Sequence, residues 1–287
     1  MSTIKTDVKI QFKNGRKFKV NIESYASAQD VVQDFQNREV RHSNYDMKNE
    51  SYSKSWDGVN SYNEALELMR LGYQPTVDKL QETLKANKLG TGKRISFENN
   101  VHGFAPIVPL ALKGVPNSMV NMTMKPIKCK VINVYYDMGI NADASSEDII
   151  KAGQKLLGTI IELEKQGYRF NLYAIQAFSG EKDADILCVK VKSSDKPIDL
   201  KRISFPLTHP AFFRVIGFDW QGRSPITKYR GDGRGRALTS EIDDSLAKEF
   251  AEQAFGDNSV YLSCRSIKRR NEKYIKEVLT NDKSNNR

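Results

Sequence analysis

The chain has 287 residues, a formal net charge of +10, 39% hydrophobic residues and 28% charged residues. This length suits one large domain or two modest ones, and the composition is that of a globular protein. No apolar run approaches the roughly 18 residues that cross a bilayer, and residues 1–10 lack the apolar core of a signal peptide. The sequence therefore predicts a cytoplasmic protein without a membrane partner.

Cysteine usage and charge further narrow the classes of protein to which this chain could belong. Cys129, Cys188 and Cys264 lie far apart and form no Cys-x-x-Cys pair, which argues against a disulfide framework or a zinc site. The surplus of positive charge indicates a polyanionic partner as one possibility. The alternative is a solvated basic face that keeps the protein in solution.

The first 40 residues predict a small unit of two strands and a helix. Apolar and polar residues alternate over residues 7–22, and the pair Asn14-Gly15 at the centre favours a two-residue type I′ turn. Residues 26–35 then show apolar side chains at helical spacing. We expect residues 1–40 to form a β-hairpin followed by one helix.

Residues 41–127 predict a loop, a helical hairpin and an irregular segment. Ser61 and Glu64 form a capping box at the start of one helix, Gly72 ends it, and Pro75 opens the next. Residues 90–125 are rich in Gly and Pro yet contain an apolar stretch. We expect this segment to lie against the main domain as an extended strap that covers a sheet edge or a groove.

Residues 128–178 carry the clearest fold signal. Residues 131–136 are dense in β-branched and aromatic side chains, as in a strand covered on both faces, and residues 172–178 repeat this pattern. Ser145 or Ser146 caps the long helix between them, in which Gly153 and Gly158 predict close approach to the sheet. The unit is predicted to be a parallel β-α-β crossover.

The remaining elements extend this sheet. Residues 185–192 predict an antiparallel strand at the sheet edge, where Lys190 and Lys192 would discourage further pairing. Helices are predicted over residues 211–218, 240–255 and 265–279, with a short strand at 260–264 and a frayed tail at 282–287. The predicted fold class is α/β: a Rossmann-like, mostly parallel sheet with helices on both faces over residues 128–281, preceded by a small α+β region.

The polar loop after the first central strand is the predicted functional rim. Ligands of open α/β sheets bind at the carboxyl ends of the strands. Asp137 ends that strand, and Gly139 and Asp143 follow in the loop. The residues predicted to contact a protein partner there are Asp137, Asn141, Ser145 and Ser146.

This order of strand, Asp-containing loop, helix and strand, over about residues 128–280, resembles a von Willebrand factor A-type domain. That family holds a divalent cation with an Asp-x-Ser-x-Ser loop plus a Thr and an Asp from later loops. Here Gly139 and Asn141 replace the two serines, and a hard cation needs oxygen ligands. The resemblance thus implies a degenerate loop with no cofactor, or else Mg²⁺ held by Asp137, Asn141, Thr208 and Asp219. The alternative is that Asp137 caps the turn or helix that follows.

A looser resemblance concerns short motifs outside this loop. The strings at residues 55–58, 72–73, 114–119 and 204–210 are similar to those of uncharacterised proteins encoded by bacteriophages and mobile elements. This resemblance implies a viral or plasmid setting inside a bacterial host cell, and it implies no activity.

Basic residues mark a possible nucleic-acid surface. Residues 222–236 interleave arginines with glycines, and glycines let a backbone approach a phosphate that arginines can bind. The alternative is a flexible, solvated loop. Together with the closing helix, the candidate phosphate contacts are Arg223, Lys228, Arg230, Arg234, Arg236, Arg265, Lys268, Arg269 and Arg270.

Catalytic motifs are missing from the sequence. The three histidines, His42, His102 and His209, form no His-x-x-x-His pair, and no Gly-x-Ser-x-Gly elbow occurs. The sequence therefore favours a non-enzymatic binding or assembly protein that docks a protein partner at the rim, with Thr208 and Asp219 nearby. The alternatives are a nucleic-acid-binding protein and a metal-dependent enzyme.

Overall fold

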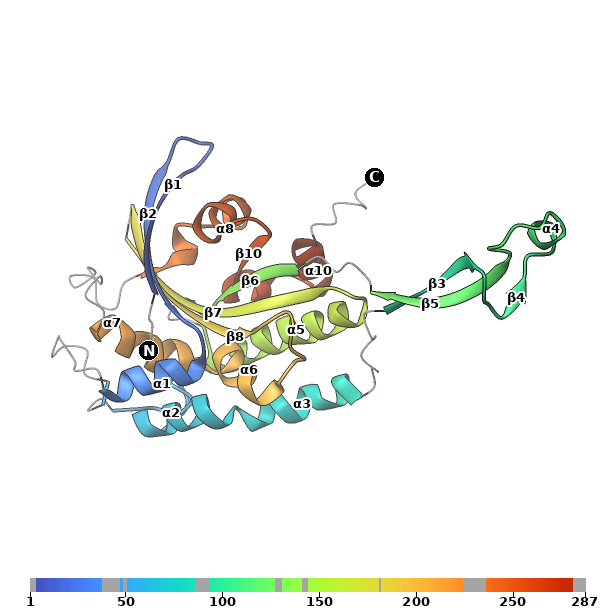
Figure 1. Ribbon diagram of the computed structural model, residues 1–287. Coiled ribbons are helices and arrows are strands. Elements are labelled where there is room, and N and C mark those ends of the chain that lie inside the picture. The colour runs from blue at the N-terminus through green and yellow to red at the C-terminus, as the bar shows by residue number, and fades with distance from the viewer. Residues whose placement is uncertain are drawn as a thin grey trace.

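A mixed seven-stranded sheet forms the centre of the protein (Figure 1). The computed structural model describes residues 4–37, 47–48, 51–85, 93–126, 131–140, 144–180, 182–223 and 236–280. The strand order is β1-β2-β8-β7-β6-β10, and β9 also pairs with β7. The strands are β1 (Ile4–Gln11), β2 (Lys17–Tyr25), β6 (Val131–Asp137), β7 (Arg169–Ser179), β8 (Asp183–Lys192), β9 (Arg236–Ala237) and β10 (Ser259–Ser263).

The predicted α/β class is confirmed, but the sheet is mixed and not mostly parallel. Parallel pairing joins β6 to β7, β6 to β10, and β2 to β8. Antiparallel pairing joins β1 to β2, β7 to β8, and β7 to β9. Two of the antiparallel pairs are hairpins of consecutive strands, and these reverse the chain direction that a crossover would preserve.

The predicted β-α-β crossover is confirmed by β6, α5 (Ser146–Lys165) and β7. Ser145 is the N-cap of α5 and forms a capping box with Asp148. The two helix glycines differ from the prediction. A Cβ on Gly153 would lie 2.0 Å from the carbonyl oxygen of Leu207 in α6, so this close approach is to a helix and not to the sheet, whereas a Cβ on Gly158 would meet nothing within 4 Å.

Helices cover both faces of the sheet, unequally. The larger core cluster joins one face of the sheet to most of the helices, and the smaller cluster joins the other face to α8 and the inner side of the β1–β2 hairpin. Figure 1 shows α1, α2, α3, α5 and α6 below the sheet and α8 above it. The further helices are α1 (Ala28–Asn37), α2 (Tyr62–Leu71), α3 (Gln74–Lys85), α6 (Leu200–Thr208), α7 (Phe218–Arg223), α8 (Ala247–Phe255), α9 (Cys264–Arg269) and α10 (Glu272–Thr280).

Shorter helical turns complete the body. The helix predicted over residues 211–218 is a π-helix, η2 (Phe212–Gly217), that continues into α7, and a 3-10 turn, η3 (Leu238–Ser240), precedes α8. A Cβ on Gly217 would lie 2.6 Å from the side chain of Gln176, so this helix packs directly against β7. Among the described residues, none of these helices has both the length and the apolar character needed to cross a membrane.

The N-terminal hairpin is confirmed, but its turn and its place differ from the prediction. The N–H of Gly15 donates to the carbonyl of Phe12 at 2.8 Å, and Phe12 and Arg16 close a three-residue loop. Gly15 has a φ of +84° and Asn14 does not have a positive φ, so the loop is not a type I′ turn. Strand β2 pairs with β8, which makes the hairpin part of the main sheet.

This pairing also corrects the predicted edge. Strand β8 lies inside the sheet, and β1 is the edge strand on that side. Lys192 is buried and forms an ion pair of 2.6 Å with Glu164 of α5, so it does not protect an exposed edge.

Residues 93–126 form a projecting arm and not a strap. The arm consists of β3 (Lys93–Asn100), β4 (Ala105–Pro106), the one-turn helix α4 (Val108–Leu112) and β5 (Met119–Pro126). Its strands form a separate three-stranded sheet of order β3-β5-β4. Figure 1 shows the arm extending away from the body beyond the right-hand end of α5. It therefore covers no edge of the main sheet.

Candidate functional site

Asp137 lies where predicted, at the carboxyl end of β6, but its side chain is fully buried. Its Oδ1 accepts a hydrogen bond from the N–H of Gly139 at 2.8 Å, and its Oδ2 accepts one from the hydroxyl of Tyr261 at 2.8 Å. Burial raises the pKa of Asp137 from 3.8 to about 7, against the lowering effect of these donors. The carboxyl group therefore holds two strands and a turn together, and it does not contact a partner as predicted.

Residues 55–56 contact Ser146, one of the predicted rim residues. The hydroxyl of Ser146 lies within hydrogen-bond distance of the carbonyl oxygens of Ser55 (2.9 Å) and Trp56 (2.8 Å). The guanidinium of Arg214 lies 3.5 Å from the centroid of the Trp56 ring and donates to the carbonyl of Ala144 at 2.7 Å. We call this set of contacts among Trp56, Ser146 and Arg214 the clamp. In it, the hydroxyl of Ser146 is bonded within the chain.

The other predicted rim residues have separate partners. Ser145 is exposed and caps α5, while Asn141 and Asp143 lie outside the described residues. Thr208 is buried, and its hydroxyl lies 3.0 Å from that of Thr76. The predicted rim is therefore not one surface open to a partner.

Asp219 belongs to a buried ion pair. Its carboxylate lies 2.8 Å from the guanidinium of Arg223 and accepts a hydrogen bond from Tyr62. Burial raises the pKa of Asp219, and Arg223 opposes this effect. Because Asp137, Thr208 and Asp219 each bond to different protein groups, these residues do not fit a Mg²⁺ site. Within the part of the chain that the structure describes, no group of three or more His, Cys, Asp or Glu could hold a metal ion.

The predicted phosphate contacts within residues 222–236 divide into three groups. Arg223 is fully buried and donates to the carbonyl of Phe35 at 2.7 Å, so its prediction as a phosphate contact is wrong. Lys228, Arg230 and Arg234 lie outside the described residues. Arg236 is exposed at the start of β9.

The closing helix is two helices, α9 and α10, that meet at residues 270–271. Lys268 pairs with Asp148 at 2.9 Å and Arg270 pairs with Asp244 at 3.1 Å, while Arg269 is exposed and Arg265 is half-buried. Partly exposed pairs of this kind stabilise little. Lys268, Arg269 and Arg270 lie at the surface, where they could contact a phosphate.

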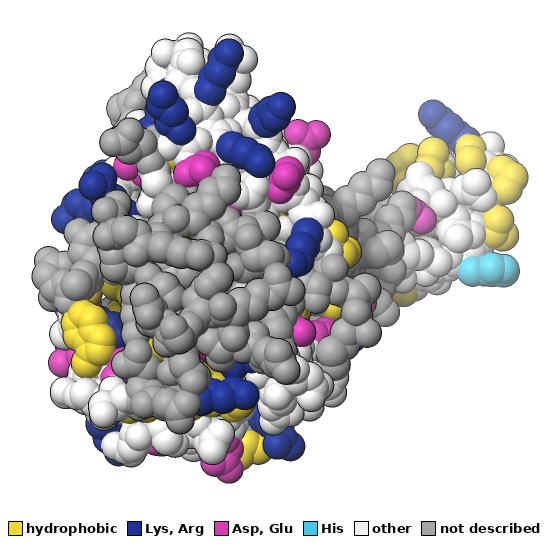
Figure 2. Space-filling view, turned by 90° about the vertical axis from the view of Figure 1, so that its left-hand side faces the viewer, with side chains coloured by type: hydrophobic (Ala, Val, Ile, Leu, Met, Phe, Trp, Pro, Cys, Tyr) yellow, Lys and Arg dark blue, Asp and Glu magenta, His cyan; other side chains and the backbone are white. Residues whose placement is uncertain are grey.

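Sequence reasoning missed the basic side chains of the hairpin. Lys5, Lys9, Lys13 and Lys17 are exposed on β1 and β2 or in the turn between them. Figure 2 shows Lys and Arg side chains, with Asp and Glu between them, around the upper end of the molecule, where Figure 1 places the hairpin tip. The recurrence of lysine every four residues, at positions 5, 9, 13 and 17, was the available signal.

Most of the exposed large hydrophobic side chains of the described residues lie on the arm. Of the eleven large hydrophobic side chains that are exposed among the described residues, seven lie on the arm. These seven are Phe97, Val101, Phe104, Val108, Leu112, Val115 and Met122. Leu112 is 83% exposed and Phe104 is 68% exposed, and the rings of Phe97 and Phe104 meet edge to face at 6.2 Å. Sequence reasoning noticed this apolar stretch but assigned it to an internal contact.

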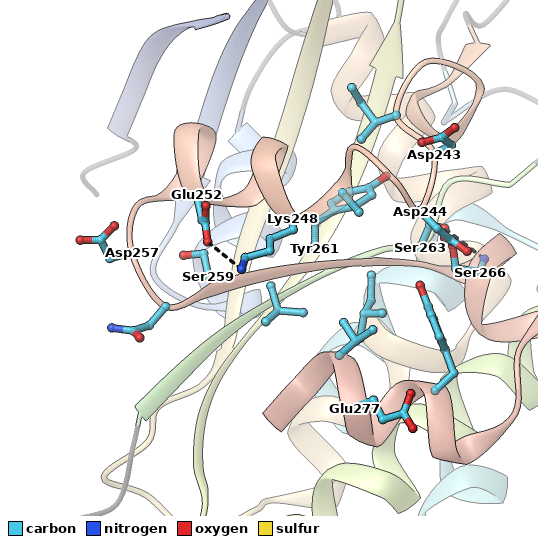
Figure 3. A pocket seen from close by; sticks show the side chains of 17 residues that line it. Asp243, Asp244, Lys248, Glu252, Asp257, Ser259, Tyr261, Ser263, Ser266 and Glu277 are labelled. Atoms are coloured by element: carbon cyan, nitrogen blue, oxygen red, sulfur yellow. Dashed lines mark hydrogen bonds and ion pairs between the residues drawn. The ribbon is translucent and has the colours of Figure 1, made fainter. Parts of the chain in front are cut away.

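A groove of about 830 Å³ runs beside β10, at the end of the sheet opposite β1. Figure 3 shows it between α8 and α10, with the side chains of β10 along its floor. Every residue of β10 lines the groove, together with residues from the segment before α8 and from both helices. The sequence analysis identified no residue of this groove as functional.

Comparison with protein families matches nearly the whole chain to one family model. A family model described as a domain of unknown function (DUF7192) matches residues 5–283. None of the curated proteins and none of the solved structures compared with the chain matches it. The family match runs from the first strand of the hairpin to beyond α10, so the arm and the groove both lie inside it. The chain therefore belongs to the DUF7192 family.

Proposed function

We propose that this protein is a non-enzymatic binding and assembly protein that docks a protein partner through the arm, residues 93–126. The observation that carries this proposal is the concentration of exposed apolar side chains there, seven of them on one projecting element. Contiguous exposed apolar surface in a folded protein marks an interaction site. The docking element is thus the arm and not the rim around Asp137.

Burial of one Phe or Leu side chain contributes roughly 1.5–3 kcal/mol to association. Phe104 and Leu112 are among the most exposed of the seven, and replacing both with Ser should weaken partner binding by about a hundredfold or more. Leu71, 62% exposed on α2, offers a matched control on the body.

The test is an affinity purification from the native host after nuclease treatment, followed by measurement of the affinity for the partner recovered. The double variant of Phe104 and Leu112 should lose that partner, and Leu71→Ser should retain it. Retention of every partner by the double variant would contradict docking through the arm.

The pattern of β6, Asp137, α5 and β7 supports the finer proposal of a von Willebrand A-like body with a degenerate metal loop. A phage or mobile-element setting and a location in a bacterial cytoplasm likewise remain proposals, since they rest on the resemblance of short motifs.

Nucleic-acid binding is a second candidate function, favoured by the net charge of +10 and the exposed basic residues of the hairpin and of α9. Such binding should weaken steeply as salt rises. An electrophoretic mobility assay at low salt tests it: replacing Lys9, Lys13 and Lys17 with Gln should reduce the shift of DNA or RNA. The absence of any shift in the unmodified protein would dismiss this candidate.

A further inference from the structure

We propose that the groove along β10 binds an extended segment of a partner protein that bears Lys or Arg, and that this segment adds to the sheet as a further strand. The proposal concerns a surface separate from the arm. It starts from the position of β10 at the end of the strand order, where β6 is its only neighbour among the described strands.

The register fixes which backbone groups face the groove. The N–H of Asn133 donates to the carbonyl of Asn258 at 2.9 Å, and Ser259 is paired with Asn133 in a parallel ladder. In such a ladder alternate residues bond to the same neighbour, so Val260 and Leu262 bond to β6. The N–H and C=O groups of Ser259 and Tyr261 therefore point away from β6, toward the groove.

The walls of the groove suit one added strand. Helix α8 lies against one face of the sheet and α10 against the other, and Figure 3 shows the groove between them. The volume, about 830 Å³, falls within the roughly 300–1,000 Å³ of known ligand sites. Val260, Leu262 and Val278 give the walls an apolar component. An extended segment can thus place apolar side chains inward and use its backbone on β10.

The charge of the lining decides the chemistry of the occupant. Five carboxylates and one cation line the groove of this basic protein. These are Asp243, Asp244, Glu252, Asp257 and Glu277, with Lys248.

Internal ion pairs neutralise this charge only in part. Lys248 lies 3.8 Å from Glu252 and Lys273 lies 3.9 Å from Glu277, with all four side chains about half exposed or more. Asp244 pairs more closely, with Arg270 at 3.1 Å. Five carboxylates face these three cations, so the groove keeps an acidic lining that complements basic side chains.

The probe is a capped peptide of about nine residues that alternates Val and Lys, long enough to span β10. Its affinity is measured by fluorescence anisotropy on the full chain. Two further peptides carry backbone N-methyl groups, one at its odd-numbered residues and the other at its even-numbered residues. Because a strand bonds to its neighbour through alternate residues only, one methylated peptide should lose at least about tenfold in affinity and the other should bind as the parent does.

Protein variants locate the binding. Glu252→Gln combined with Asp257→Asn should weaken the Lys peptide by about threefold to tenfold. Glu147→Gln is the matched control, because Glu147 is also an exposed helical carboxylate paired with a lysine four residues away, outside the groove. A peptide with Glu in place of Lys should bind more weakly than the parent.

The proposal is overturned by equal binding of the two methylated peptides, which would show attraction by charge alone. It is also overturned if the Lys peptide fails to bind, or if sedimentation shows self-association that the peptide and the groove variants abolish. In that last case a second copy of the chain would be the occupant.

Discussion

Replacing Asp137 with Asn should change how the stability of this protein depends on pH. The carboxyl group is fully buried, and its pKa in the folded state is raised from 3.8 to about 7. Below about pH 3.8 the group is protonated in both states. Between about pH 4 and pH 7 the folded protein holds the proton more tightly than the unfolded chain, so the free energy of unfolding falls as pH rises.

The magnitude follows from the size of the shift. About three pKa units at about 1.4 kcal/mol each give a loss of about 4 kcal/mol between pH 4 and pH 8. The asparagine variant does not ionise, and it can still accept the hydrogen bond from Gly139 while its amide donates to the oxygen of Tyr261. Relative to the unmodified protein, the variant should therefore gain about 4 kcal/mol over this range.

The measurement is urea unfolding of both proteins at intervals from about pH 4 to pH 8, with the difference in unfolding free energy plotted against pH. His209, whose pKa is lowered to about 4 by burial, titrates in both proteins and cancels in the difference. A difference that stays constant with pH would refute the reasoning, because it would show that folding does not raise the pKa of Asp137. Tyr261→Phe removes a donor, so it should raise the pKa of Asp137 further and extend the window upward.

Three other predictions use urea unfolding at neutral pH. Gly158→Ala should stabilise the protein by about 1 kcal/mol, because alanine has the higher helix propensity and its Cβ would meet no other atom. Gly153→Ala should destabilise it, because the added Cβ would overlap a carbonyl oxygen of α6. Stabilisation by both substitutions would show that α6 does not pack against Gly153. Glu164→Gln should cost about 3–5 kcal/mol by leaving Lys192 buried without its charge partner, and a smaller loss than about 1 kcal/mol would indicate that water reaches the pair. Arg214→Lys should cost about 1–2 kcal/mol and alter the fluorescence of the stacked indole; unchanged emission would contradict the clamp.

The elements that the sequence predicted well depend on neighbours along the chain. The crossover from β6 through α5 to β7 needs only two apolar strands and one amphipathic helix, all within about fifty residues. The capping of α5 by Ser145 involves Asp148, three residues away. Such local signals are complete in a short stretch of sequence.

The errors came from contacts distant in sequence. Strand β8 was predicted as an edge, yet β2, more than 150 residues earlier, pairs with it. The position of Asp137 was predicted correctly, but its burial depends on Tyr261, 124 residues away. Trp56, which contacts Arg214 beside Ser146, precedes that arginine by 158 residues. No local pattern specifies such partners.

The arm shows a different limit. Its Gly, Pro and apolar residues predicted an extended segment, and extended strands are present. Hydrophobicity indicates that a side chain favours burial, but it does not say whether this chain or another protein supplies the covering surface. The groove was missed because it consists of one short strand and two helix faces whose residues are ordinary in sequence.

The pairing at the base of the arm has a consequence for variation in this family. Lys93 lies opposite Pro126, so the first and last described residues of the arm are neighbours. Residues added or removed in matched pairs along β3 and β5 would lengthen or shorten the arm without altering the strand register of the body. The length of the arm and the stability of the body can therefore change independently of each other.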